Sequence, residues 1–94
     1  MARMKTPPHV KRLLEALLTG LKDAGIRAKA DFEPIQGTRL HRVYVVAPKF
    51  EALRPSERQS IVWRIAQASL SPEEQLLISM IMTLTPKELA GVGF

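Results

Sequence analysis

The side chains in this chain that can do chemistry are mainly cationic, and the chemistry they suggest is the binding of phosphate groups. Arg54, Ser56 and Arg58 surround the predicted start of a helix, where exposed backbone amides also attract anions. Glu51 and Glu57 lie among them and can neutralise the same site. The residues that we predict to contact nucleic acid are Arg39, Arg42, Lys49, Arg54, Arg58, Lys11 and Arg12.

Charge is distributed unevenly along the 94 residues, whose net charge is +5. Residues 1–49 contain ten Lys and Arg against four Asp and Glu, whereas residues 50–94 contain four against five. Two interpretations stay open at this point, an uneven solubility charge and an anionic partner bound by the front half. If the partner is nucleic acid, the predicted second helix alone cannot supply the attraction. The strongest basic cluster then combines Arg3, Lys5, Lys11 and Arg12 with Arg39, Arg42 and Lys49.

Metal binding and catalysis have little support in the sequence. There is no cysteine, which excludes disulfides, thiolate catalysis and cysteine-ligated clusters within the chain. His41 is the one weak candidate for a metal ligand, because no second ligand stands at metal spacing from it, and His9 is expected to be solvated. Glu73 and Glu74 are adjacent, so their side chains diverge, and no serine has a histidine nearby in the sequence. We therefore predict no catalytic residues, no resident metal and a non-enzymatic protein.

The elements that must position these residues begin with an amphipathic helix and a strand. Apolar residues recur at spacings of three and four over residues 10–21, which predicts a helix with one face in the core. Gly25 suits the left-handed residue just past its end. Over residues 26–32 the period changes to two, which predicts a half-buried strand. The solvent-exposed face of this strand carries two cations and two anions, so we do not expect a basic patch there. That face carries Arg27, Lys29, Asp31 and Glu33.

A second strand and a second helix follow a glycine-containing turn. The four apolar residues 43–46 predict a strand antiparallel to the first. Pro48 ends this strand, because proline cannot donate to a ladder. The second helix has two start signals, Pro55 at a first helical position and a capping box between Ser56 and Gln59. The two signals differ by one residue, which is within normal boundary error.

The last third of the chain predicts a third strand. Trp63 of the second helix is expected at the margin of the core, with a stacking platform for bases as the alternative. Pro72 opens one more helical turn or forms part of a bend. Residues 76–85 are apolar and rich in β-branched side chains, so we predict a strand there rather than a helix. Residues 86–89 can form a final helical turn.

The predicted order is α-β-β-α-β in one domain over residues 1–94, with a basic arm at 1–7 and a frayed tail at 90–94. We expect an α+β fold in which a three-stranded mixed sheet has its two main helices packed on one face. No apolar run approaches the roughly 18 residues that a membrane span needs. The absence of cysteine and of a secretory signal predicts a cytoplasmic protein.

Two segments of the chain resemble the BolA family, whose fold is similar to that of type II KH domains. Residues 45–51 (VVAPKFE), followed by Arg58 and then Val62-Trp63, are similar to the family's valine-rich strand, S-x-x-F-E-G bend and R-H-R-x-V-Y helix. Residues 81–89 (IMTLTPKEL) are similar to its closing strand and T-P-x-E-W ending. The resemblance covers essentially the whole chain and implies a BolA-like fold.

The chain departs from the family pattern at three places. The R-H-R motif is Arg58-Gln59-Ser60 here, the glycine of the bend is Ala52, and the family's signature histidine falls near Leu77. The resemblance implies a partnership with monothiol glutaredoxins, in which that histidine helps to bind a shared 2Fe-2S cluster, and it also implies DNA-binding regulation. Leucine provides neither the imidazole nor the thiolate that binds such iron. The departure therefore favours the nucleic-acid role.

Three hypotheses follow from these observations. The preferred one is a non-enzymatic BolA-like regulatory or binding module whose partner is DNA or RNA. The alternative is a protein-interaction adaptor that pairs with a glutaredoxin, with His41 standing in for the family's second, loop-borne ligand position. The last is a homodimer built on the apolar residues of an edge strand.

Overall fold

The computed structural model describes residues 6–91 of the chain. The predicted α-β-β-α-β order and the three-stranded mixed sheet are both confirmed. Residues 1–5 of the predicted arm and residues 92–94 of the predicted tail lie outside the described part. The elements are α1 (Pro8–Asp23), β1 (Lys29–Pro34), β2 (His41–Val46), the 3-10 helix η1 (Pro48–Ala52), α2 (Pro55–Ser69), α3 (Pro72–Gln75), β3 (Ile78–Leu84) and α4 (Pro86–Gly91).

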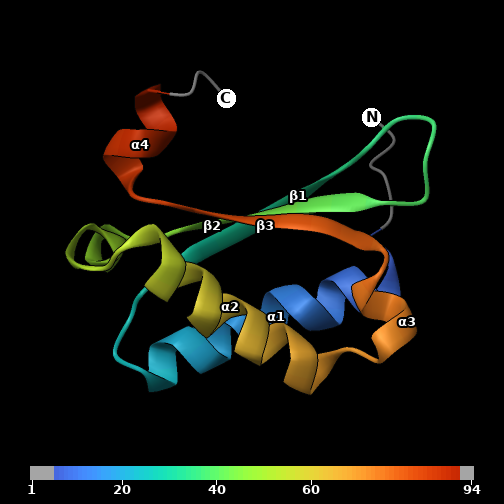
Figure 1. Ribbon diagram of the computed structural model, residues 1–94, viewed down its shortest axis with the longest axis horizontal. Helices are drawn as coiled ribbons and strands as arrows, with labels where there is room; N and C mark the ends of the chain where they lie inside the picture. Colours follow the sequence, from blue (N-terminus) through green and yellow to red (C-terminus); the bar gives the residue numbers. More distant parts are fainter. Residues whose placement is uncertain (1–5, 92–94) are drawn as a thin grey trace.

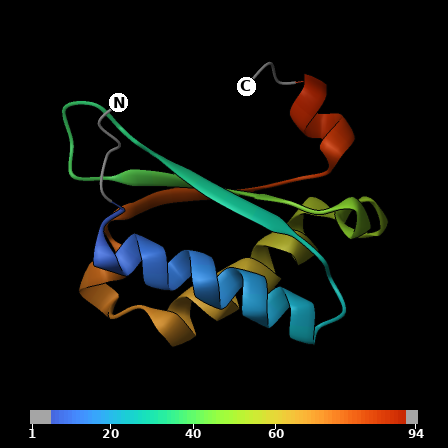
Figure 2. The ribbon, with the colours of Figure 1, turned by 180° about the vertical axis from the view of Figure 1, so that it is seen from behind.

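The sheet has the strand order β1-β2-β3, with β1 antiparallel and β3 parallel to the central strand β2. Helices α1, α2 and α3 lie on one face of this sheet, whereas the short helix α4 lies on the other side (Figures 1 and 2). Because side chains alternate along a strand, every second residue points away from α1 and α2. We call this second surface the open face. Its side chains are Lys29, Asp31, Glu33, Arg42, Tyr44, Val46, Met80, Met82 and Leu84.

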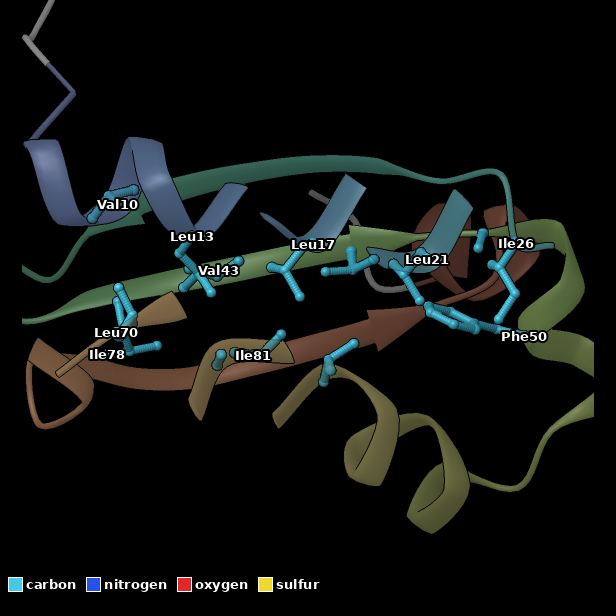
Figure 3. Close-up of a cluster of buried hydrophobic side chains, with 14 residues drawn as sticks. Val10, Leu13, Leu17, Leu21, Ile26, Val43, Phe50, Leu70, Ile78 and Ile81 are labelled. Atoms are coloured by element: carbon cyan, nitrogen blue, oxygen red, sulfur yellow. The ribbon is translucent and has the colours of Figure 1, made fainter. Parts of the chain in front are cut away.

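The core lies between the sheet and the two long helices. Most of the predicted apolar stripe of α1 is buried, with Leu13, Leu17 and Leu21 directed toward β2 (Figure 3), whereas Leu18 is exposed. Helices α1 and α2 approach closely at Gly20, where an added Cβ would lie 2.8 Å from the Cδ1 atom of Ile65. Glycine therefore allows these two helices to pack side by side over the sheet.

Most local signals in the sequence are confirmed, but one capping prediction is wrong. Gly25 follows α1 with a φ of 79°, as predicted for a left-handed residue. Helix α2 begins at Pro55, yet its N-terminal hydrogen bond runs from the Arg54 backbone N–H to Glu57 Oε1, at 2.8 Å. Ser56 and Gln59 form no capping box, because α2 turns Gln59 toward β3, where its Nε2 donates to the Ile81 carbonyl at 2.8 Å.

Element boundaries also differ from the prediction by a few residues. β1 begins at Lys29 rather than at residue 26, because Ile26 is buried in the turn and its N–H donates to the Leu21 carbonyl at 2.8 Å. Helix α4 continues to Gly91, past the predicted final turn. The third strand is confirmed, and the chain before it forms the short helix α3. Among residues 6–91, no helix has the length and the apolar character to cross a membrane.

Side chains occupy several hydrogen-bonding groups at both edges of the sheet. On the β3 edge, the carbonyls of Ile81 and Thr83 accept hydrogen bonds from side chains of α2. On the β1 edge, Asp31 Oδ1 accepts the Phe32 N–H at 2.8 Å, and Pro34 has no N–H. Such contacts oppose the addition of another strand. A homodimer formed by edge pairing stays an untested hypothesis that this arrangement does not favour.

Candidate nucleic-acid interface

The predicted nucleic-acid residues are divided between opposite ends of the sheet. The β1–β2 loop, the start of α1 and α3 lie at one end, and the end of α1, η1 and α4 lie at the other (Figure 1). Lys11, Arg12, Arg39 and Arg42 belong to elements of the first end, and Lys49 and Arg54 to elements of the second. The structure therefore does not gather the predicted residues into one patch.

Arg58 is not an interface residue, which corrects the prediction. Its side chain is only 6% exposed, because α2 packs this face against the sheet. The Arg58 Nε atom donates to the Leu53 carbonyl at 3.1 Å, and Nη1 donates to Glu88 Oε1 at 2.8 Å and to the Thr83 carbonyl at 3.3 Å. The guanidinium is thus occupied by the protein itself.

Arg12 and Arg42 are each engaged by a carboxylate. Arg12 Nη1 lies 2.8 Å from Glu74 Oε1, and Arg42 Nη1 lies 2.7 Å from Glu33 Oε1. Hydrogen bonding to Tyr44 is the main reason that the pKa of Arg42 is raised, with Glu33 contributing. The hydrogen bond from Arg12 lowers the pKa of Glu74. Both arginines contribute less positive field than a count of cations suggests.

The other predicted residues remain accessible. Lys11, Arg39 and Arg54 are exposed, and within residues 6–91 none of them forms an ion pair. Lys49 is exposed as well, and its Nζ donates to the Gly25 carbonyl at 2.8 Å. This hydrogen bond to an uncharged carbonyl fixes Lys49 beside the end of α1 and keeps its charge.

A cluster of cations that the sequence did not reveal surrounds the end of α1, beside Lys49. We call it the basic end, and it consists of Lys22, Arg27, Lys29 and Lys49. Lys22, Gly25 and Arg27 line one hollow beside the start of β1, and Arg27 and Lys29 line a second, while Lys49 is bonded to Gly25. All four side chains are exposed, and in the described part of the chain none is ion-paired.

No carboxylate of the described residues forms an ion pair with these cations. Glu33 accepts hydrogen bonds from Arg42 and Tyr44, and Asp31 accepts the backbone N–H of Phe32. Asp23 and Glu51 are exposed near the basic end, but neither pairs with its cations within the described residues. Arg27 and Lys29 therefore form no ion pair with Asp31 or Glu33 within the described residues, although both carboxylates keep their negative charge. Counting charges along a strand misses which carboxylate bonds to which partner.

The opposite end of the sheet holds the two histidines in contact. The rings of His9 and His41 meet edge to face with centroids 5.8 Å apart, so His9 is not solvated as predicted. His9 Nε2 and His41 Nδ1 are both buried and have no hydrogen-bond partner among residues 6–91. Burial, followed by the nearby charge of His41, lowers the pKa of His9. The backbone N–H of His41 donates to the Leu77 carbonyl at 2.9 Å, so His41 lies beside Leu77.

Trp63 lies at the margin of the core, as predicted. Its Nε1 donates to Gln59 Oε1 at 3.1 Å, so the indole is held in a fixed orientation. Together with Gln59 and one edge of β3 it lines a hollow of ≈ 350 Å³. No exposed cation of the described residues lines this hollow, so the alternative role as a stacking platform gains no electrostatic support.

Neither the residues nor the comparisons with known proteins identify a metal centre or a family. Within the described residues, no group of three or more His, Asp or Glu side chains is placed to hold a metal ion. No protein-family model matches the chain, and no curated protein matches it at a significant level. The function must therefore be argued from the geometry alone.

Proposed function

We propose that this protein is a non-enzymatic, BolA-like cytoplasmic binding module, and that its partner is a nucleic acid bound at the basic end. The observation that carries the proposal is the convergence of Lys22, Arg27, Lys29 and Lys49 from α1, the turn after it, β1 and η1, where no carboxylate of the described residues forms an ion pair with them. Phosphates are the chemistry that such a cluster binds, by releasing counterions from the polyanion.

Arg54 extends the same surface toward the start of α2. It is exposed at the residue before this helix, and its side chain forms no ion pair within residues 6–91. Arg58 does not contribute, because its guanidinium is buried. Contacts of this kind fix a strand by its phosphates and carry no base information, so we propose binding without strong sequence preference.

The test compares two double charge reversals with the same change in net charge. Lys22→Glu with Arg27→Glu removes half of the basic end, whereas Lys11→Glu with Arg39→Glu changes the opposite end. Fluorescence anisotropy with labelled DNA and RNA oligonucleotides should show the first variant to lose on the order of 100-fold in affinity at low salt, and the second far less. The salt slope should also fall by about one for each phosphate contact removed. An equal loss in both variants would contradict the assignment to the basic end.

The glutaredoxin-partner role is a second candidate, and the observation that favours it is the histidine pair. His41 lies beside Leu77, and His9 supplies a second imidazole at the same corner. Imidazole nitrogen can bind cluster iron, so the donor chemistry fits. His9 Nε2 and His41 Nδ1 are buried, so a ring that binds iron through one of these two nitrogens must first turn.

This second candidate has its own readout. Co-purification with a monothiol glutaredoxin, together with the visible absorption of a 2Fe-2S cluster that is lost in His41→Ala, would support it. The double reversal at the basic end should leave that spectrum unchanged. A colourless complex, or none, would remove this candidate.

A further inference from the structure

The open face of the sheet contains a hollow next to α4. Its volume is ≈ 880 Å³, and Tyr44 and Val46 of β2 line it together with Pro86 and Leu89 of α4. Pockets that bind small molecules are commonly about 300–1,000 Å³ and mostly apolar. The hollow exists because α4 lies on the side of the sheet opposite α1 and α2 (Figures 1 and 2). Its size and walls therefore suit the apolar part of a small ligand.

Two cations stand at the same hollow. Arg27 and Lys29 line it, are exposed, and form no ion pair in the described part of the chain. Asp31 lines it as well, but its Oδ1 accepts the Phe32 N–H at 2.8 Å. The lining thus combines apolar walls with a small excess of positive charge.

From these walls and charges we infer that the hollow between α4 and the open face binds an anionic amphiphile, a carboxylate attached to an aliphatic chain. The chain packs on Val46, Pro86 and Leu89, and the carboxylate reaches Arg27 or Lys29. This site goes beyond the nucleic-acid proposal. It shares two cations with the basic end but depends on apolar walls that phosphate binding does not use.

The wall that α4 provides is held by a chain of contacts from the core. Glu88 Oε1 accepts from Arg58 Nη1 at 2.8 Å and from the Thr85 N–H at 2.8 Å. The buried arginine therefore fixes the first turn of α4 and places Leu89 over the sheet. Glu88 acts as a positioning residue for the hollow, since it does not line the hollow itself.

The probe is dodecanoate, and dodecyltrimethylammonium is the control with the same chain and the opposite charge. Isothermal titration below the micelle concentration should show saturable binding of one dodecanoate, with the cationic probe at least about fivefold weaker. Amide shifts in NMR should map to Val46 and Leu89. No saturable binding, equal binding of both probes, or shifts confined to another surface would overturn the inference.

Two variants on the open face separate the hollow from the rest of that surface. Val46→Asp places a carboxylate in the wall and should weaken dodecanoate binding at least about tenfold. Met80→Asp makes the same change at the far end of the face, outside the hollow, and should leave affinity within about twofold. Asp31→Asn removes the one carboxylate that lines the hollow within residues 6–91 and should strengthen binding. Equal effects of Val46→Asp and Met80→Asp would contradict the site.

The outcome is separable from that of the nucleic-acid proposal. Dodecanoate binding that Val46→Asp abolishes, while oligonucleotide binding persists, supports the hollow as its own site. Oligonucleotide binding without any dodecanoate binding overturns this inference alone. A thermal melt of each variant shows whether it remains folded.

Discussion

Arg58 and the basic end use the same kind of side chain for opposite purposes. Arg58 is 6% exposed, bonds to two carbonyls and one carboxylate, and places its guanidinium carbon 5.7 Å from the centroid of the Phe50 ring. The cations of the basic end are exposed and bond to no carboxylate among the described residues. Arg58 therefore holds elements of the fold together, whereas the basic end is available to a partner. The difference is set by the face of the element that carries each cation.

The largest expected effect is on stability, from Arg58→Ala. Removing the guanidinium leaves the Leu53 and Thr83 carbonyls without their donor and Glu88 without its partner. We expect the free energy of unfolding to fall by about 1–3 kcal/mol, because two carbonyls lose their buried donor while Glu88 is exposed to solvent. Urea denaturation measures it. Arg58→Lys keeps the positive charge but lacks the planar set of N–H donors of the guanidinium, so it should recover only part of the lost stability. A loss below about 1 kcal/mol would show that Arg58 is not structural.

The next effect is on binding, from single neutral substitutions at the basic end. Arg27→Ala and Lys29→Ala should each weaken oligonucleotide binding about three- to tenfold, because each removes one phosphate contact. The free energy of unfolding should change by less than about 0.5 kcal/mol, since both side chains are exposed and unpaired. Anisotropy and urea titration on the same samples give both numbers. Lys11→Ala, at the opposite end, is the matched control.

Acid should weaken the contact between the core and α4. The backbone N–H of Thr85, and then Arg58, lower the pKa of Glu88 below its usual 4.5. Its contribution to stability is therefore complete above pH 4.5 and is lost as the pH falls through the lower, folded value. Glu88→Gln should reduce stability at neutral pH and flatten this acid limb. The measurement is the urea midpoint of the original protein and of Glu88→Gln at several acidic pH values. Equal decreases of the two midpoints with falling pH would contradict a role of Glu88 in the acid sensitivity.

The smallest effect is expected at the histidine pair. Burial and the charge of His41 lower the pKa of His9 from 6.5, so the unfolded chain takes up a proton before the folded one does. Stability should then fall slightly as the pH drops from 6.5 toward the folded pKa of His9. His9→Phe keeps a ring against His41 and removes the buried nitrogen, so its melting temperature should vary less over this range. An unchanged pH profile would argue against the effect.

Local signals in the sequence predicted the fold well. One of them also indicated that Arg58, which we expected at the surface, is buried. The stripe of α1, the alternation in β1 and the run of residues 43–46 each report which face of an element is buried. Arg58, Val62 and Ala66 are spaced by four and are all buried. That spacing places Arg58 on the inner face of α2, but its charge led to an exposed prediction. Periodicity was the better guide, because packing decides which face of a helix is covered.

The sequence by itself determined the order of elements, the mixed three-stranded sheet and the buried faces, because these depend on apolar spacing and on proline and glycine positions. Only the tertiary structure decided which cations belong together. Lys22, Arg27, Lys29 and Lys49 come from three elements and the turn between α1 and β1, and their convergence depends on how α1 ends beside η1 and the start of β1. Likewise, no local pattern relates Glu88 to Arg58, which are 30 residues apart. Charges interact through space, so a surface built from separate elements cannot be seen in the order of residues along the chain.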